Sequence, residues 1–364
     1  MKWKNCTADE RKQHVDGFVA VTPTMARALD VLRRCYRSHG SGQQASCSFI
    51  VGETGVGKTT VANEFLEEVR AEHMGILMDG QNLKVQDEEA YPHNMSVTLE
   101  RPGHGLIRPV LKIQVGKKST YKQLFAQTLA AIGVNVAKAT RFGEMMSIAR
   151  IQIREQGIRM IIFDECQHIA DSSMTRDPYE AADVFKVLMK EARVQIACVG
   201  LPYTTDLLLE NRQLETLKKE EMTMRPFQPD FNDGSELMGF LQALSTDLPF
   251  DRAQQIHKGP MAIRLHFASD GYVAGIAMMV SEAAKIAIDE GVEVIDLDLL
   301  GEAYRRKHDV PVNENPFLMA KVDPDGFRAL KAARWNERVL AAQKNRATRR
   351  QKALVLKREA AAHD

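Results

Sequence analysis

The sequence has few cysteines, and their spacing does not suggest a shared site. Five cysteines are scattered along 364 residues without any Cys-x-x-Cys pair. This pattern argues against a zinc site and against a disulfide framework. We therefore expect a protein of a reducing compartment.

Long hydrophobic runs are also missing. No segment approaches about eighteen consecutive apolar residues, the length that a membrane-spanning helix needs. The N-terminus is charged from its start and has no apolar signal core. We expect a cytoplasmic protein with no membrane partner.

Net charge is nearly absent, but the charges are unevenly distributed. The chain carries a formal charge of +1, whereas residues 328–358 hold eleven Lys and Arg against Glu337, a net charge of +10. A block of like charge is most often a solvated arm, and sometimes one that binds nucleic acid or an acidic partner. The rest of the chain is therefore acidic. A hydrophobic fraction of 44% is that of an ordinary soluble globular protein.

A glycine-rich stretch carries the strongest motif of the chain. It reads G-x-x-x-x-G-K-T after a short apolar run and before a helical pattern. The stretch comprises Gly52, Glu53, Thr54, Gly55, Val56, Gly57, Lys58, Thr59 and Thr60.

This pattern predicts a phosphate-binding loop. Its glycines let backbone N–H groups close around phosphate oxygens. Lys58 would reach the β and γ phosphates, and the Thr59 hydroxyl would contribute to the Mg²⁺ shell. The helix that begins near Lys58 would direct its positive end at the same anion.

Two carboxylates follow a second buried strand. Residues 160–163 are consecutively apolar, which indicates a strand covered on both faces, and Asp164 and Glu165 come directly after them. Ligands of open α/β sheets bind at such strand ends. We expect Asp164 to hold Mg²⁺ and Glu165 to polarise the attacking water as general base.

The absence of two motifs narrows the choice of nucleotide that the chain would bind. The chain has no Asn-Lys-x-Asp guanine reader and no Leu-Ser-Gly-Gly-Gln stretch. Their absence counts against a GTPase and against a transporter ATPase. We therefore expect ATP and Mg²⁺ as cofactors.

The order of elements predicts a parallel α/β sheet with flanking helices. Strands expected at 46–51, 110–115, 159–165 and 194–199 alternate with helical patterns. The division expected from the pattern is an N-terminal helical segment at 1–45, a nucleotide-binding domain at 46–225 with a β-hairpin insertion at about 76–108, a helical lid at 226–310, and a basic tail at 311–364.

Four stretches together resemble the TniB/TnsC family of AAA+ ATPases, which regulate DNA transposition. They are GETGVGKTT, IIFDECQH, VGLPYTTDLLLENRQL and SDGYVAGIAMMVSEAAKIAI. The resemblance covers roughly residues 10–308. It implies a P-loop AAA+ domain with a small C-terminal lid, in a bacterial protein.

The resemblance also implies partners. Such a protein would form a homo-oligomer, a ring or helical filament, around double-stranded DNA without reading its sequence. It would connect a target-selector protein to a transposase and be released by ATP hydrolysis. Lys117, Lys118 and Thr120, at a strand-to-helix junction, match the position of the family's DNA-tracking residues. Gln167 and His168 match its Asp-Glu-x-Gln-His pattern, although a buried, hydrogen-bonded His at a helix start explains them equally well.

The chain departs from the family pattern in ways that affect hydrolysis. Relatives carry an Arg-Phe pair soon after the Gln-Leu found here at 213–214, and its arginine is the candidate finger for a neighbour's ATP. Position 201 is Leu instead of a polar sensor, and the lid motif offers no arginine. We expect slow, assembly-dependent hydrolysis, with the trans-acting cation being one of Arg212, Lys218, Lys219 and Arg225.

A protein of a different functional class would also fit these residues. A nucleotide-gated protein-remodelling or signalling module that does not act on DNA would carry the same two nucleotide motifs. Its basic tail would then bind an acidic protein.

Overall fold

The computed structural model describes most of the chain in two compact units. The described residues are 3–42, 44–78, 84–86, 94–101, 105–117, 120–137, 139–169, 178–209, 212–308, 310–321, 323, 325–329, 331–336 and 340. One unit comprises residues 17–244 and 271–275, and the other comprises 1–16, 245–270 and 276–364.

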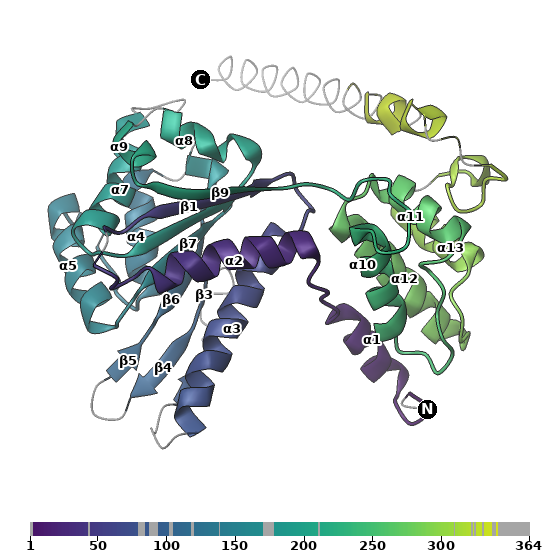
Figure 1. Ribbon diagram of the computed structural model, residues 1–364, viewed down its shortest axis with the longest axis horizontal. Coiled ribbons are helices and arrows are strands. Elements are labelled where there is room, and N and C mark those ends of the chain that lie inside the picture. Colours follow the sequence, from purple (N-terminus) through teal and green to yellow (C-terminus); the bar gives the residue numbers. More distant parts are fainter. Residues whose placement is uncertain are drawn as a thin grey trace, which may run out of the picture. The chain divides into compact units, whose positions relative to one another are not determined.

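A sheet of six strands forms the centre of the larger unit (Figure 1). Its order is β3-β6-β7-β8-β1-β9, and all neighbours from β6 to β9 pair in parallel. The parallel strands are β6 (Val110–Gln114), β7 (Met160–Asp164), β8 (Gln195–Gly200), β1 (Cys47–Gly52) and β9 (Lys218–Met224). This arrangement confirms the predicted α/β class.

Helices cover both faces of this sheet. Phe163 of β7 packs in one core cluster with helices α4 (Tyr121–Ala131), α5 (Phe142–Glu155) and α7 (Pro178–Lys190). Ile162 faces the other way, into a cluster with α2 (Pro23–Arg37) and α3 (Lys58–Met78). Successive residues of a strand point to opposite faces, so a strand covered twice must be apolar throughout.

The fifth parallel strand, β9, is missing from the sequence-based prediction. Its sequence, KKEEMTM, carries four charges, and only Met224 is buried. The strand lies at the sheet edge beside β1, where charged side chains are tolerated and useful. Three short elements precede it: η1 (Pro202–Thr205), α8 (Asp206–Leu209) and α9 (Arg212–Glu215).

The predicted hairpin insertion at 76–108 needs two corrections. Residues 76–78 belong to the end of α3, and β3 (Asn94–Ser96) pairs antiparallel with β6 as part of the main sheet. The remaining strands form a separate three-stranded antiparallel sheet. They are β2 (Lys84–Gln86), β4 (Thr98–Arg101) and β5 (Gly105–Ile107).

The smaller unit is helical. Helices occur in each part of the expected lid: α10 (Glu236–Asp247), whose last residues enter this unit, α11 (Pro260–Ser269), α12 (Val273–Glu290) and α13 (Leu297–His308). Helix α1 (Ala8–Asp16) also belongs here, tied by ion pairs from Arg11 to Glu293 and from Lys285 to Asp16. In contrast, α2 packs with the sheet, so residues 1–45 do not form one segment.

The described start of the basic tail is folded. Residues 325–329 and 331–336 are helical, after the short η2 (Val312–Glu314). Lys331 Nζ lies 2.6 Å from an Asp270 carboxylate oxygen, and Arg334 pairs with Glu314. Residues 341–364 lie outside the described residues. Among the described helices, none combines the length and apolar character needed to cross a membrane.

Both faces of β7 are predicted to contribute equally to stability. Replacing Ile161 or Ile162 by Ala should each reduce the free energy of unfolding by about 2–4 kcal/mol, because each side chain is fully buried in a different cluster. The measurement is urea denaturation followed by circular dichroism. The exposed Lys219→Ala on β9 is the control and should change stability by less than about 0.5 kcal/mol. A loss below about 1 kcal/mol for either isoleucine would contradict double coverage of the strand.

Candidate nucleotide site

The predicted phosphate loop follows the end of β1 and has the backbone geometry of an anion cradle. Gly55 and Gly57 have φ of 89° and 96°, values that side chains strongly disfavour. A Cβ on Gly52 would lie 2.5 Å from the Met224 carbonyl oxygen, so only glycine lets β9 approach here. Helix α3 begins at Lys58, which leaves first-turn N–H groups at the mouth of the loop.

Lys58 is held over the loop and is partly removed from water. Its Nζ donates hydrogen bonds to the carbonyl oxygens of Gly52 and Glu53, each 2.8 Å away. Burial lowers the pKa of Lys58, an effect that the nearby Glu165 and Asp164 carboxylates oppose. An ammonium group with only carbonyl partners is well placed to exchange them for phosphate oxygens.

Thr59 and Asp164, predicted as the metal pair, meet directly. The Thr59 hydroxyl donates a hydrogen bond to Asp164 Oδ2 at 3.0 Å, from the first turn of α3 to the end of β7. The Asp164 side chain is 4% exposed, and its other oxygen accepts from the Glu165 N–H at 2.9 Å. A hydroxyl and a carboxylate this close suit a Mg²⁺ ion that also takes phosphate oxygens as ligands.

Glu165 is held in an unusual backbone conformation. Its φ is 55°, a left-handed value that is costly for a non-glycine residue. Its carboxylate accepts a hydrogen bond from the Gln167 side-chain amide, and Gln167 Oε1 in turn accepts from the Leu201 N–H at 3.2 Å. The predicted general base is therefore tied, through the buried Gln167, to the end of β8. His168, its neighbour in the motif, is half-buried in a helical turn.

Sequence reasoning missed a buried lysine beside the metal pair. Lys112 of β6 is 7% exposed, lies 3.4 Å from Asp164 Oδ2, and donates to Asn63 Oδ1 of α3 at 2.7 Å. The signal was present, because a single Lys interrupts the otherwise apolar run VLKI. Burying an ammonium group requires a partner of opposite charge, and here that partner is the proposed metal ligand.

The lid motif also contacts the loop, which the sequence did not suggest. Tyr272 donates its phenolic hydrogen to the Glu53 carboxylate, and Ala274 N–H donates to the Gly55 carbonyl at 3.0 Å. Both residues belong to the same compact unit as the sheet. The first turn of α12 is thus hydrogen-bonded to the phosphate loop.

The four candidate trans-acting cations lie on or near the edge strand. Lys218 pairs with Glu221 within β9, whereas Lys219 and Arg225 are exposed and Arg212 begins α9. The carboxylate partner of Lys218 makes it the weakest of these candidates. The choice among the other three stays a prediction.

The predicted DNA-contact residues lie at the start of α4. Thr120 caps this helix: its hydroxyl accepts from the Gln123 N–H at 3.2 Å, and its own N–H donates to Gln123 Oε1 at 2.8 Å. Two first-turn donors are therefore already used, so fewer are free for a phosphate than the sequence suggested. Lys117 is exposed, and Lys118 lies outside the described residues.

Comparison with known proteins points to one family and one fold. Residues 90–222 match the model of the family described as "Bacterial TniB protein". No curated protein sequence matches the chain.

Solved structures similar to this one include ORC and Cdc6 proteins. ORC2 of Aeropyrum pernix, in ADPNP-ADP complexes, is 13% identical, with 82% of this chain and 72% of that chain covered and a TM-score of 0.56. ORC1 of the same organism, in complex with DNA, is 16% identical, with 83% and 73% covered and a TM-score of 0.55. Cdc6p of Pyrobaculum aerophilum is 10% identical, with 82% and 74% covered and a TM-score of 0.52.

At these sequence identities the structural similarity establishes the fold alone. The family match covers the segment from β3 to β9, which includes Asp164 and Glu165. The resemblance expected from the motifs is thereby confirmed over residues 90–222, which are similar to the TniB family, and the fold is that of the AAA+ proteins named above.

Proposed function

We propose that the protein is an ATP-dependent regulator of DNA transposition, which assembles on double-stranded DNA and links target selection to the transposase. The observation that carries this proposal is the contact of Thr59 with Asp164 beneath a complete phosphate loop, in a chain that matches the TniB model. Hydrolysis of ATP would release the assembly.

The residues of the loop fit a nucleotide with Mg²⁺. Lys58 would bind the β and γ phosphates, and first-turn N–H groups of α3 would bind the phosphate oxygens that face them. Thr59 and Asp164 would hold the metal, which neutralises charge that develops on the phosphates. The ADPNP-ADP complexes of the ORC2 structure support a nucleotide in this fold.

Glu165 would orient water for attack in competition with its present hydrogen bond. Gln167 donates a hydrogen bond to one oxygen of this carboxylate, Oε2, so a water at that oxygen would compete with the amide. Release would require movement of the turn that carries Gln167 and contacts β8. This arrangement supports slow hydrolysis that speeds up on assembly, when a cation from a neighbouring subunit completes the site.

Duplex binding would rest on charge. Lys117 and the remaining N–H donors at the start of α4 would grip a phosphate without reading bases. The basic residues at 328–358 would add a salt-sensitive contact, since each neutralised phosphate releases counterions. The DNA complex of the ORC1 structure supports DNA as a partner for this fold.

Two substitutions separate nucleotide binding from turnover. Lys58→Ala should weaken ATP binding by at least about tenfold, because the phosphates lose a charge-assisted contact. Glu165→Gln should keep the affinity and lower the hydrolysis rate by about a hundredfold or more. Binding of a fluorescent ATP analogue and phosphate release measure the two effects. If the Glu165→Gln variant hydrolyses ATP at the wild-type rate, Glu165 is not the general base.

The stability of a Lys112 variant tests the proposed metal site. Lys112→Met should destabilise the nucleotide-free protein by about 3–5 kcal/mol, because Asp164 is left buried without its cation. Mg²⁺ with ATP should restore part of this loss, since a divalent ion at Asp164 replaces the missing charge.

The measurement is the shift in Tm on adding ATP with and without Mg²⁺. The Mg²⁺-dependent part should be larger for Lys112→Met than for wild type, and unchanged for the exposed Lys258→Met. Equal Mg²⁺-dependent shifts in Lys112→Met and wild type would contradict a metal at Asp164.

DNA binding is tested at Lys117. With a slowly hydrolysed ATP analogue, Lys117→Gln should weaken binding to random-sequence duplex equally for all sequences and reduce the salt slope by about one. Gel-shift titration between about 50 and 200 mM salt measures both quantities. The exposed Lys258→Gln is the matched control. If the wild-type chain binds no duplex under these conditions, a protein-remodelling or signalling switch is the better account.

A further inference from the structure

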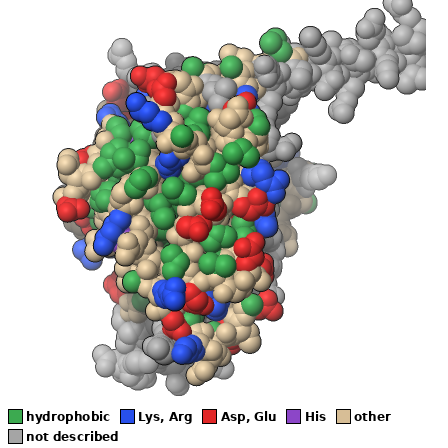
Figure 2. Space-filling model, turned by 90° about the vertical axis from the view of Figure 1, so that its right-hand side faces the viewer, with side chains coloured by type: hydrophobic (Ala, Val, Ile, Leu, Met, Phe, Trp, Pro, Cys, Tyr) green, Lys and Arg blue, Asp and Glu red, His purple; other side chains and the backbone are tan. Residues whose placement is uncertain are grey.

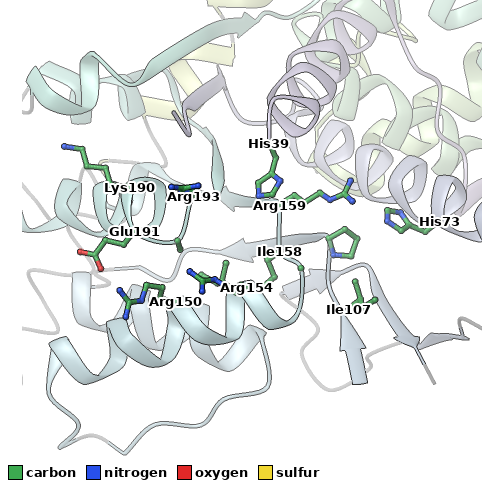
Figure 3. Close-up of a pocket in the computed structure, with 14 residues that line it drawn as sticks. His39, His73, Ile107, Arg150, Arg154, Ile158, Arg159, Lys190, Glu191 and Arg193 are labelled. Atoms are coloured by element: carbon green, nitrogen blue, oxygen red, sulfur yellow. The ribbon is translucent and has the colours of Figure 1, made fainter. Parts of the chain in front are cut away.

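A second concave site lies at the opposite end of the parallel strands from the phosphate loop. It is a cavity of about 730 Å³ whose lining includes residues just before β6, β7 and β8 (Figure 3). The phosphate loop follows the other, C-terminal, end of β1. Neither the nucleotide motifs nor the predicted DNA contacts account for this cavity.

The cavity is lined by five cationic side chains. They are Arg150, Arg154, Arg159, Lys190 and Arg193, and Glu191 is the one carboxylate residue among the lining residues. Within the described part of the chain, none of the five forms an ion pair. Figure 3 shows Arg150 and Arg154 coming from α5, and Lys190 and Arg193 from the end of α7. Gathering like charges without counter-ions is unfavourable unless an anion is bound.

One other face of the protein differs in this respect. The face drawn in Figure 2 carries acidic and basic side chains next to one another, with hydrophobic ones between them. Mixed charges of that kind produce no strong local field. The cavity differs from that face in its excess of positive charge.

Arg193 adds a second, independent observation. Its φ is 59°, a left-handed conformation just after α7, where helices commonly carry glycine. The Val194 N–H closes the helix end by donating to the Leu188 carbonyl at 3.2 Å. An arginine in place of the favoured glycine is strained, and strain of this kind is common where a side chain is needed.

The floor of the cavity decides which anion fits. It contains aliphatic residues, among them Ile107, Pro109, Ile153 and Ile158, and no Phe, Tyr or Trp occurs among the described lining residues. Arg159 lies over the Tyr36 ring at 5.6 Å, so that ring is already covered. The imidazoles of His39 and His73 are the aromatic rings among these lining residues, so a base has no large ring to stack on. An apolar side chain flanked by carboxylates matches both the aliphatic residues and the cationic ones.

We propose that this cavity binds an acidic peptide segment of a partner protein. Carboxylates of the segment would pair with the guanidinium groups of Arg150, Arg154 and Arg193, and one apolar side chain would rest on the aliphatic floor. Arginine suits this role because its planar fork binds a carboxylate through two hydrogen bonds. The proposal is independent of the nucleotide site and goes beyond the function proposed above.

The test uses fluorescence anisotropy with the full-length chain. The probe is a labelled peptide of repeated Glu-Glu-Leu, compared with one of repeated Gln-Gln-Leu. The wild-type chain should bind the acidic peptide at least about tenfold more tightly. The variant Arg154→Gln with Arg193→Gly should lose about tenfold of that affinity. Its Arg193→Gly change relieves the left-handed strain, so loss of folding does not explain a loss of binding.

Control variants separate the cavity from an exposed arginine elsewhere and from the nucleotide site. Arg252→Gln removes an exposed arginine of the helical unit and should leave the affinity unchanged. Lys58→Ala should also bind the acidic peptide normally, so failure of the nucleotide proposal would not affect this one.

Two outcomes would overturn the proposal. Unchanged peptide affinity in the Arg154→Gln and Arg193→Gly variant would show that the cavity does not hold the acidic segment. If the same variant instead loses affinity for a random duplex, and the duplex displaces the peptide from wild type, the occupant is nucleic acid.

Discussion

The hydrogen bond from Thr59 to Asp164 is the contact on which the account of the site depends. It joins the first turn of α3 to the end of β7, two elements far apart in the sequence, at 3.0 Å. The contact exists because β1 and β7 end at the same edge of one parallel sheet, with β8 between them. Lys112 holds the same carboxylate from β6, so three elements converge on one buried charge. A change in charge at this point therefore affects all three.

Two further sets of hydrogen bonds restrain the proposed base and the phosphate loop. Gln167 ties one oxygen of the Glu165 carboxylate to the end of β8. Tyr272 and Ala274 bond the start of α12 to the phosphate loop, and the same helix continues into the other compact unit. A change in the hydrogen bonds of Glu53 or Gly55 would therefore alter contacts of the first turn of α12.

The sequence predicts the parts of the fold whose pattern has a single physical explanation. Continuous apolar runs identify β1, β7 and β8, and the glycines with Lys58 identify the phosphate loop. Strand β9 escapes this reasoning because KKEEMTM is an edge strand whose pairing with β1, not its own hydrophobicity, holds it in place. Lys112 escapes because a lysine in a strand normally indicates a solvent-facing position, and its buried partner Asp164 lies on a different strand. The left-handed conformations of Glu165 and Arg193 escape too, since only glycine marks such positions in a sequence.

Electron microscopy of negatively stained protein tests the central claim most directly. The account predicts rings or filaments on random duplex DNA with a slowly hydrolysed ATP analogue, and their loss on exchange into ADP. It also predicts that Thr59→Ala, which removes the hydroxyl that contacts Asp164, forms few of them. Isolated particles under saturating DNA and nucleotide, or equal assembly by Thr59→Ala and wild type, would contradict the claim that this site controls assembly.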